Sequence, residues 1–421
     1  MEYKSWRCLS DRISLENIFA NRDYIEFNVL YSLIHASRYI PKTAGVKCLI
    51  EQFQEEATRE GIKVGDALRD NVHQALELLG NGLIQQNVEL IEKINSGEID
   101  LHEFYAELLR IIYRIIFILY AEQRGMLPGA GTLYFEQFSL SSLRILAEKP
   151  IKADKNYDLW NKLFLTFHLV KDGNEFLEVP CYNGALFKDE NLEIIVENNL
   201  HISNDLHLRI IRLLTTSVIN NVRQRINFME IKEEEIGSIY ESLLDYKPVI
   251  GLNSQFQLIP QSLERKSTGS YYTPKELIDI LIRTTLQPLV EDRIKNIEDS
   301  QMKEKAILDL KICDPACGGG TFLLAALDFL GKKLAEVRTR SHILSENDLR
   351  VARRKILQHC IYGVDKNPLA VELAKISLWL RACVKDKPLN FLDNHIKLLS
   401  LIHISEPTRP LYISYAVFCL K

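Results

Sequence analysis

The sequence predicts two kinds of structure in succession, an α-helical amino-terminal part and then the first part of an α/β sheet. Apolar residues recur every three to four positions through most of residues 1–235, which is the period of an amphipathic helix. Short apolar runs follow at Leu310–Cys313 and Ile361–Val364. Each run leads into a turn and a long amphipathic pattern, as in a parallel sheet connected by helices.

Composition excludes several classes of protein. The chain has 421 residues, 47% of them hydrophobic and 26% charged, which is ordinary for a globular protein of about two to three domains. Its net charge of −4 rules out a uniformly basic nucleic-acid binder but leaves a local basic groove open. The longest strongly apolar stretch, Ile111–Ala121, carries Arg114 and is too short to span a bilayer. With 8 scattered cysteines and no signal-peptide pattern, we expect a reduced, cytoplasmic protein without a bound metal or a membrane contact.

Regular apolar spacing predicts helices around Leu78–Ile94 and Leu101–Ile116 in the amino-terminal part. Ser203-Asn204-Asp205 supplies capping residues that open a further helical pattern, which we expect to run to Val222. A short helix is expected over Ile236–Leu244.

The most informative motif is Asp-Pro-Ala-Cys-Gly-Gly-Gly at Asp314–Gly320, directly after the first predicted strand. Pro315 would end that strand, because proline lacks an N–H and restricts the residue before it. Three consecutive glycines let the backbone approach a ligand closely, and a helix over Phe322–Val337 would point its positive dipole end at the same place. The alternative, a glycine-rich turn without a ligand, would carry a high cost in backbone entropy.

The type of ligand follows from what the loop lacks. A phosphate-binding P-loop needs Gly-Lys-Ser/Thr, and the chain has no such sequence here. The dinucleotide fingerprint would need glycine at position 323, which is Leu323. With both nucleotide alternatives weakened, the acidic start of the loop favours S-adenosylmethionine.

A second motif follows the strand Ile361–Val364, which ends at Asp365. An acidic residue at the end of a second strand accepts hydrogen bonds from ribose hydroxyls in nucleotide-type folds. The interval from Asp314 is longer than the usual ~20 residues, so we expect an extra helix at Leu349–His359. Asn367 is predicted to cap the next helix, with Pro368 at its first position. Taken alone, an aspartate at the end of a strand is more often a helix cap than a ligand-binding residue, and the ligand role of Asp365 rests on its pairing with the glycine loop.

A third motif, Gly-Ser-Tyr-Tyr-Thr-Pro-Lys-Glu, lies at Gly269–Glu276. Thr273 and Glu276 have the spacing of a capping box, and Pro274 stands at the first helical position. The exposed N–H groups of this helix could hold a carboxylate such as that of methionine. A plain helix cap remains the alternative.

Together the three motifs resemble the gamma-class adenine-N6 DNA methyltransferases, and within them the methylase modules of type IIG restriction–modification enzymes. Ala121–Gly125 and Ile236–Leu244 in the helical part are similar as well, so the resemblance covers roughly residues 25–397. It implies a Rossmann-like S-adenosylmethionine-dependent methyltransferase sheet and methyl transfer to the N6 amine of an adenine flipped from the duplex. The implied partners are double-stranded DNA and a restriction or specificity subunit.

The resemblance also implies roles for individual residues. Thr273 would hold the methionine carboxylate, and Asp314 with Gly318–Gly320 would line the methionine end. Asp365 would bind the ribose hydroxyls, and Lys366 with Asn367 would lie near the adenine. Ala316 belongs to the same cofactor-binding set.

The family's catalytic motif is Asn/Asp/Ser-Pro-Pro-aromatic. This chain has 13 prolines, no two of them adjacent, so we assign no catalytic residue. From about Leu398 the sequence departs from the family and resembles translated sequencing-adaptor sequence. We therefore expect a helical domain at 1–235, the N-terminal part of the methyltransferase domain at 236–397 and a non-native tail at 398–421. The catalytic loop and most of the DNA-binding region would then be missing and the chain inactive.

The amino-terminal end is a separate expectation. Type IIG enzymes often begin with a nuclease domain, but residues 1–60 show no strand pattern of that kind, so we do not predict cleavage. Two other functions stay open: a methyltransferase acting on RNA or protein, and a non-catalytic cofactor-binding or interaction subunit.

Overall fold

The computed structural model describes residues 24–40, 47–182, 185–219, 222–228, 246–260, 275–382 and 391–399, together with Ile231, Gly237, Leu243 and Thr273. The chain divides into two compact units, Met1–Val64 and Gly65–Lys421. In the first unit the described elements are α2 (Tyr24–Ile34), the turn η1 (Ala36–Arg38) and the start of α3 (Leu49–Gln86), which continues into the second unit. All the motifs singled out in the sequence lie in the second unit.

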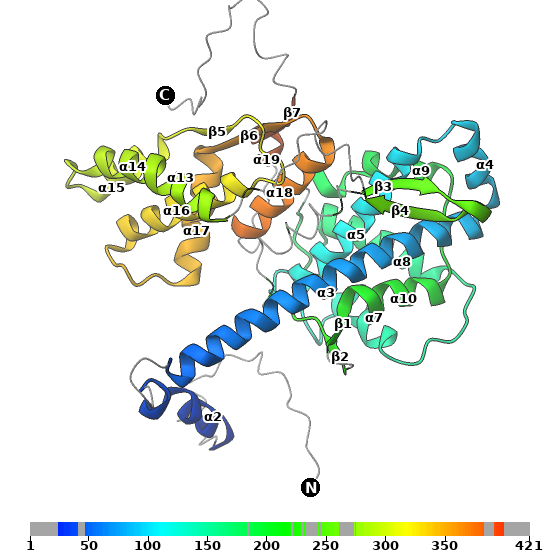
Figure 1. Ribbon diagram of the computed structural model, residues 1–421, viewed down its shortest axis with the longest axis horizontal. Helices are drawn as coiled ribbons and strands as arrows, with labels where there is room; N and C mark the ends of the chain where they lie inside the picture. The colour runs from blue at the N-terminus through cyan, green and yellow to red at the C-terminus, as the bar shows by residue number, and fades with distance from the viewer. Residues whose placement is uncertain are drawn as a thin grey trace, which may run out of the picture. The chain divides into compact units, whose positions relative to one another are not determined.

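Helix α5 (Leu101–Gln123) forms the centre of the helical part (Figure 1). Asp100 is its N-cap, and the Asp100 carboxylate accepts hydrogen bonds from the backbone N–H groups of His102 and Glu103. The apolar stretch Ile111–Ala121 is buried within it, so this segment is a core helix. Arg114 is buried there too. Its guanidinium donates to the carbonyl oxygens of Leu186 and Lys188 at 2.9 and 2.8 Å, which compensates for the loss of water.

Shorter helices surround α5. They are α4 (Val88–Ser96), α6 (Leu133–Gln137), α7 (Leu140–Ala147), α8 (Asp158–Asp172), α9 (Glu193–Glu197) and α10 (Asn204–Thr215), with the turns η2 (Ala185–Phe187) and η3 (Asp189–Leu192). The predicted start of a helix at Ser203-Asn204-Asp205 is confirmed, because Ser203 is the N-cap of α10.

The end of α10 corrects the sequence prediction. The helix ends at Thr215 instead of continuing to Val222, and the strand β1 (Thr216–Ile219) begins at the next residue. β1 pairs antiparallel with β2 (Val222–Arg225). A run of β-branched residues favours a strand, and the Asn71 side chain donates to the carbonyl of Thr216 at 2.7 Å, so this carbonyl is satisfied outside a helix. The amino-terminal part is therefore mostly, but not wholly, helical.

A second hairpin, which the sequence reading did not predict, consists of β3 (Tyr246–Ile250) and β4 (Phe256–Pro260), joined by the turn η4 (Leu252–Ser254). It packs on α3 through the fully buried Phe256. Gly80 of α3 permits this contact, since a Cβ there would lie 2.6 Å from the Phe256 ring. The predicted helix at Ile236–Leu244 lies largely outside the described residues.

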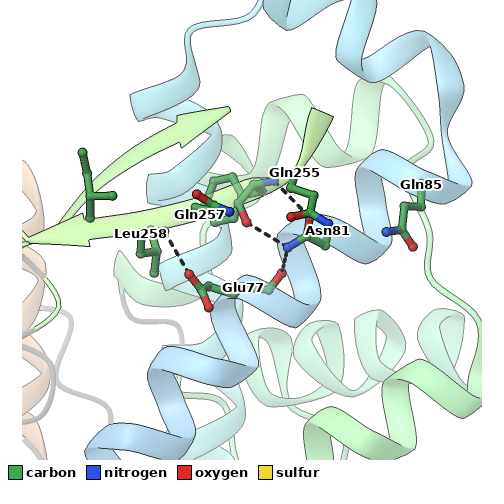
Figure 2. A pocket seen from close by; sticks show the side chains of 8 residues that line it. Glu77, Asn81, Gln85, Gln255, Gln257 and Leu258 are labelled. Atoms are coloured by element: carbon green, nitrogen blue, oxygen red, sulfur yellow. Dashed lines mark hydrogen bonds between the residues drawn. The ribbon is translucent and has the colours of Figure 1, made fainter. Parts of the chain in front are cut away.

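Side chains of α3 bind the outer edge of β4 (Figure 2). Asn81 accepts a hydrogen bond from the backbone N–H of Phe256 at 3.0 Å and donates to its carbonyl at 2.8 Å. Glu77 accepts from the N–H of Leu258 at 3.0 Å. A groove of about 350 Å³ lies over these contacts, and Gln85, Gln255 and Gln257 contribute to its polar lining.

The carboxy-terminal part contains a three-stranded parallel sheet in the order β5-β6-β7. Its strands are β5 (Ile312–Asp314), β6 (Ile361–Asp365) and β7 (Ile396–Leu398), and its helical elements are α13 (Lys275–Leu281), the π-helical turn η5 (Ile282–Leu286), α14 (Gln287–Ile294), α15 (Ser300–Leu308), α16 (Thr321–Thr339), α17 (Glu346–His359), α18 (Pro368–Ala382) and α19 (Leu392–His395). The predicted alternation of strands and helices is confirmed, including the extra helix between the two motif strands. Whether the full sheet is Rossmann-like stays a prediction.

The helical part and the sheet part pack directly on each other. The ring centroid of Trp379 in α18 lies 4.4 Å from that of Phe117 in α5 and 5.3 Å from that of Tyr182. The two parts therefore share an aromatic core within the second unit. The predicted domain boundary at residue 235 stays a prediction, and residues 400–421 of the expected tail lie outside the described residues.

Candidate functional site

The glycine loop follows β5 as a tight turn. Asp314 is the last residue of the strand, and its carboxylate accepts a hydrogen bond from the N–H of Ala316 at 3.0 Å. The N–H of Gly320 donates to the carbonyl of Cys317 at 2.8 Å. Helix α16 then starts at Thr321, one residue before the predicted start at Phe322. The motif therefore reverses the chain within a few residues at the carboxyl end of a strand.

Two glycines of the loop have left-handed backbone conformations, with φ of +51° at Gly318 and +88° at Gly320. These angles favour glycine over any residue with a Cβ. A Cβ at Gly318 would meet no described atom within 4 Å, so none of the described residues fills the space beside the backbone here. A Cβ at Gly320 would lie 3.2 Å from the Cβ of Ala374 in α18. Gly318 thus leaves room beside the loop, whereas Gly320 allows the loop to pack against a helix.

Asp365 brings the two strand-end motifs together. One carboxylate oxygen accepts a hydrogen bond from the N–H of Gly318 at 2.9 Å, across 47 residues of sequence. The other oxygen accepts from the N–H of Asn367 at 2.8 Å. The side chain of Asn367 in turn accepts from the N–H of Leu369 at 3.0 Å, so Asn367 caps α18 and Pro368 is its first residue, as predicted. Asp365 therefore bonds the glycine loop, while Asn367 supplies the helix cap.

The sequence alone does not identify the residues that hold the glycine loop on β6. The N–H of Cys317 donates to the carbonyl of Val364 at 2.9 Å. Gly363 makes room for this approach, because a Cβ there would lie 2.8 Å from Leu323 and 3.2 Å from the Cβ of Cys317. A glycine isolated inside a strand is a signal of close backbone approach, and it could have identified this contact.

The electrostatics of the site are those of two neighbouring carboxylates. Burial raises the pKa of Asp314, and the nearby charge of Asp365 raises that pKa further. Burial also raises the pKa of the Cys317 thiol to about 12, with contributions from both carboxylates. Cys317 is therefore a protonated packing residue. The concentration of negative charge suits a ligand that brings hydrogen-bond donors or a positive charge.

The third motif approaches the same site through the helix that follows it. Leu281 and Ile282, from α13 and η5, line a small cavity of about 40 Å³ together with Asp314 and Phe322. Thr273 is half-buried two residues before α13, which begins at Lys275; residues 261–272 and position 274 lie outside the described residues. The helix predicted to follow this motif is therefore confirmed from Lys275 onward. The predicted Thr273 cap and the role of Thr273 in holding the cofactor stay predictions.

The two other predicted cofactor residues are exposed: Ala316, two residues after Asp314, and Lys366, directly after Asp365.

No group of three or more His, Cys, Asp or Glu side chains is arranged to hold a metal ion in the described part of the chain. Among the described helices, none combines the length and apolar character needed to cross a membrane.

A glycine loop at the end of one parallel strand is thus bonded to an acidic residue at the end of the next, which is the edge where open α/β sheets bind their ligands. Residues 233–396 match the N-6 DNA Methylase family. The resemblance of this segment to the adenine-N6 DNA methyltransferases of restriction–modification systems is thereby confirmed.

Several relatives match larger parts of the chain. A putative type II restriction enzyme and methyltransferase of Methanocaldococcus jannaschii, RM.MjaORFECS2P, is 26% identical over 68% of this chain and 25% of its own length. The type II restriction enzyme and methyltransferase RM.Eco57I of Escherichia coli is 26% identical over 48% of this chain and 19% of its own length. DNA methyltransferase A of Bacillus subtilis is 23% identical over 62% of this chain and 26% of its own length. The chain thus spans about a quarter or less of these relatives.

A solved structure, the type IIL restriction–modification enzyme MmeI in complex with DNA, is similar at 19% identity and a TM-score of 0.42. The match covers 76% of this chain and 36% of that chain.

Proposed function

We propose that this chain carries the S-adenosylmethionine-binding part of an adenine-N6 DNA methyltransferase of a restriction–modification system. The observation that carries the proposal is the hydrogen bond between Gly318 and Asp365, which joins the two predicted cofactor motifs at neighbouring strand ends. The family match of residues 233–396 supports the same conclusion. In this proposal the sheet is the first part of a Rossmann-like methyltransferase domain at 236–397, preceded by a helical domain at 1–235.

The cofactor fits these residues because they offer free hydrogen-bond acceptor positions, free space and negative charge. A carboxylate has about four acceptor positions, and in the described structure Asp365 uses two of them for Gly318 and Asn367. Its remaining lone pairs can accept from the two ribose hydroxyls. The open space at Gly318 admits the methionine end, and the charge of Asp314 is complementary to a sulfonium. Thr273, Ala316, Gly320 and Lys366 complete the proposed cofactor-binding set.

The bound cofactor would supply an electrophilic methyl group, and the acceptor would be the N6 amine of adenine in double-stranded DNA. The residues described here would hold and orient the cofactor. None of them is assigned a role in transferring the methyl group. We expect the chain alone to bind cofactor without methylating DNA, because no two of its prolines are adjacent to form the family's catalytic loop. A restriction or specificity subunit is the further partner that this function implies.

Calorimetric titration with S-adenosylmethionine tests the proposal. Loss of a charged hydrogen-bond acceptor costs about 1.5–3 kcal/mol, so we expect Asp365→Ala to weaken binding about 10- to 100-fold. Asp365→Asn, which keeps one acceptor oxygen, should weaken it less. Asp299→Ala is the matched control, because Asp299 also accepts a backbone N–H at 3.0 Å but caps α15.

Thermal melting of each variant would show that it is folded. Equal affinity in wild type and a folded Asp365→Ala variant would remove the ribose assignment. No binding heat with the wild type would overturn the proposal and favour a non-catalytic interaction subunit. Joining the chain to a downstream segment with a Pro-Pro-aromatic loop and finding methylated RNA or protein, with unmodified DNA, would favour the other methyltransferase classes.

A further inference from the structure

The β1–β2 hairpin lies beside α7 and α10 (Figure 1). Five arginines of these elements lie near one another there. These residues, which we call the arginine cluster, are Arg144 of α7, Arg209 and Arg212 of α10, and Arg223 and Arg225 of β2. The chain as a whole has a net charge of −4. A local gathering of guanidinium groups in an acidic protein therefore stands out.

The fold brings these side chains together by regular geometry. Arg223 and Arg225 are two residues apart in a strand, so both point to the same face of the hairpin. Arg209 and Arg212 are three apart on a helix and also share a face. Arg212 fixes the arrangement, because its guanidinium donates to the carbonyl oxygens of Ala147 and Lys149 at the end of α7, at 2.6 and 2.5 Å.

The charges lie close enough to affect one another. Burial lowers the pKa of Arg212, and the charges of Arg223 and Arg209 lower that pKa further. Burial likewise lowers the pKa of Arg144, with Arg225 as the next cause. Like charges held together by a fold are destabilising unless an anion offsets them.

The protein supplies only part of that anionic charge. Arg225 pairs with Glu148 at 2.5 Å, and the exposed Arg209 has a longer contact to Asp205 at 3.7 Å. Within the described residues, Arg223 is exposed and makes no ion pair, and the Nε atom of Arg144 is buried without a hydrogen-bond partner. The cluster thus retains positive charge, and the donors that an external anion can reach are those of exposed side chains such as Arg223.

We propose that the arginine cluster binds the phosphodiester backbone of double-stranded DNA. Guanidinium groups present planar pairs of donors that match phosphate oxygens, and phosphate contacts hold a protein on a duplex without reading its sequence. The inference rests on the proposed function for the choice of DNA as the polyanion. None of its residues belongs to the cofactor set, so it adds a second and independent contact to that function.

Fluorescence anisotropy with a labelled duplex of arbitrary sequence, at several salt concentrations, tests this inference. Each phosphate contact contributes about 0.9 to the slope of log affinity against log salt concentration. We expect the double variant R209A/R223A to lower that slope by about 1.8. R209K/R223K keeps the charge and should retain most of the slope. R293A/K295A removes two exposed charges from and beside α14 and should leave the slope unchanged.

Each outcome decides the question. An unchanged slope in a folded R209A/R223A variant overturns the inference, as does a loss of slope confined to single-stranded RNA of the same length. A wild-type chain without salt-dependent duplex binding overturns it too. Cofactor titration on the same samples separates the two ideas: binding heat that persists in R209A/R223A leaves the proposed function standing whatever becomes of the cluster.

Discussion

Arg110 of α5 and Glu372 of α18 form a two-point ion pair, with Nε 3.0 Å from one carboxylate oxygen and Nη2 2.9 Å from the other. Both side chains are largely buried, at 16% and 13% exposure. The pair joins the central helix of the helical part to the helix that starts directly after the Asp365 motif. The position of α18, and with it the Asn367 cap, therefore depends on the helical part.

Removing one partner of this pair should be strongly destabilising. We expect Arg110→Ala to lower the free energy of unfolding by about 3 kcal/mol, because it leaves the Glu372 carboxylate largely buried without its cation. The double variant R110M/E372M should be much closer to wild type, since apolar side chains of similar length replace both charges. Urea denaturation measures both. Equal losses in the single and double variants would show that packing, and not the unpaired charge, sets the effect.

The two left-handed glycines of the loop should respond differently to alanine. Gly320→Ala should lower stability by about 2 kcal/mol or more, because the left-handed penalty of about 1–2 kcal/mol adds to a contact 3.2 Å from Ala374. Gly318→Ala meets open space and should cost about 1 kcal/mol. It should instead weaken S-adenosylmethionine binding, since its methyl group enters the proposed cofactor space. Denaturation and calorimetry on the same two variants would contradict this division if Gly318→Ala bound cofactor normally.

Acid should destabilise the helical part through His207. Complete burial lowers its pKa from 6.5 to about 4, and neither ring nitrogen has a hydrogen-bond partner among the described residues. The unfolded chain therefore takes up a proton that the folded chain refuses, and stability is lost as the pH falls from about 6.5 to about 4. At about 1.4 kcal/mol per pKa unit, the loss reaches up to about 3 kcal/mol.

His207→Leu should remove this pH dependence, whereas His102→Leu, at an exposed position, should leave it in place. Urea midpoints measured across this pH range would reveal both effects. A wild-type midpoint that stays level between pH 6.5 and 4 would count against the mechanism.

Glu122 should prove to be a structural residue. Its side chain is half-buried, and the carboxylate accepts hydrogen bonds from the Tyr134 hydroxyl at 3.0 Å and from the N–H groups of Leu140 and Ser141 at 2.8 Å each. Glu122→Ala leaves these donors unsatisfied and should cost about 3 kcal/mol. Glu136→Ala, at an exposed position nearby, should change stability by less than about 0.5 kcal/mol. A thermal melt that shifts equally in both variants would contradict this role.

Local chemistry explains why much of the site could be predicted. A proline after Asp314, the glycines that follow it, and Asn367 before Pro368 each act on their immediate neighbours, so their strand ends and helix starts can be inferred from the sequence. The β1–β2 hairpin was missed because Thr216–Ile219 continues the apolar spacing of α10, while the Asn71 contact that favours the strand comes from a distant helix. The bonds from Gly318 to Asp365 and from Arg110 to Glu372 join segments far apart in sequence, which periodicity cannot reveal.

The contact of Asn81 with Phe256 has a consequence for the behaviour of the protein in concentrated solution. An amide side chain that accepts from a backbone N–H and donates to the carbonyl of the same residue offers β4 what a neighbouring strand would offer. An incoming extended segment from another chain would have to displace Asn81 and Glu77 before it could pair there. Helix α3 thus occupies the hydrogen-bonding groups at this edge of the hairpin. It thereby blocks the edge-to-edge self-association to which unpaired strands are prone.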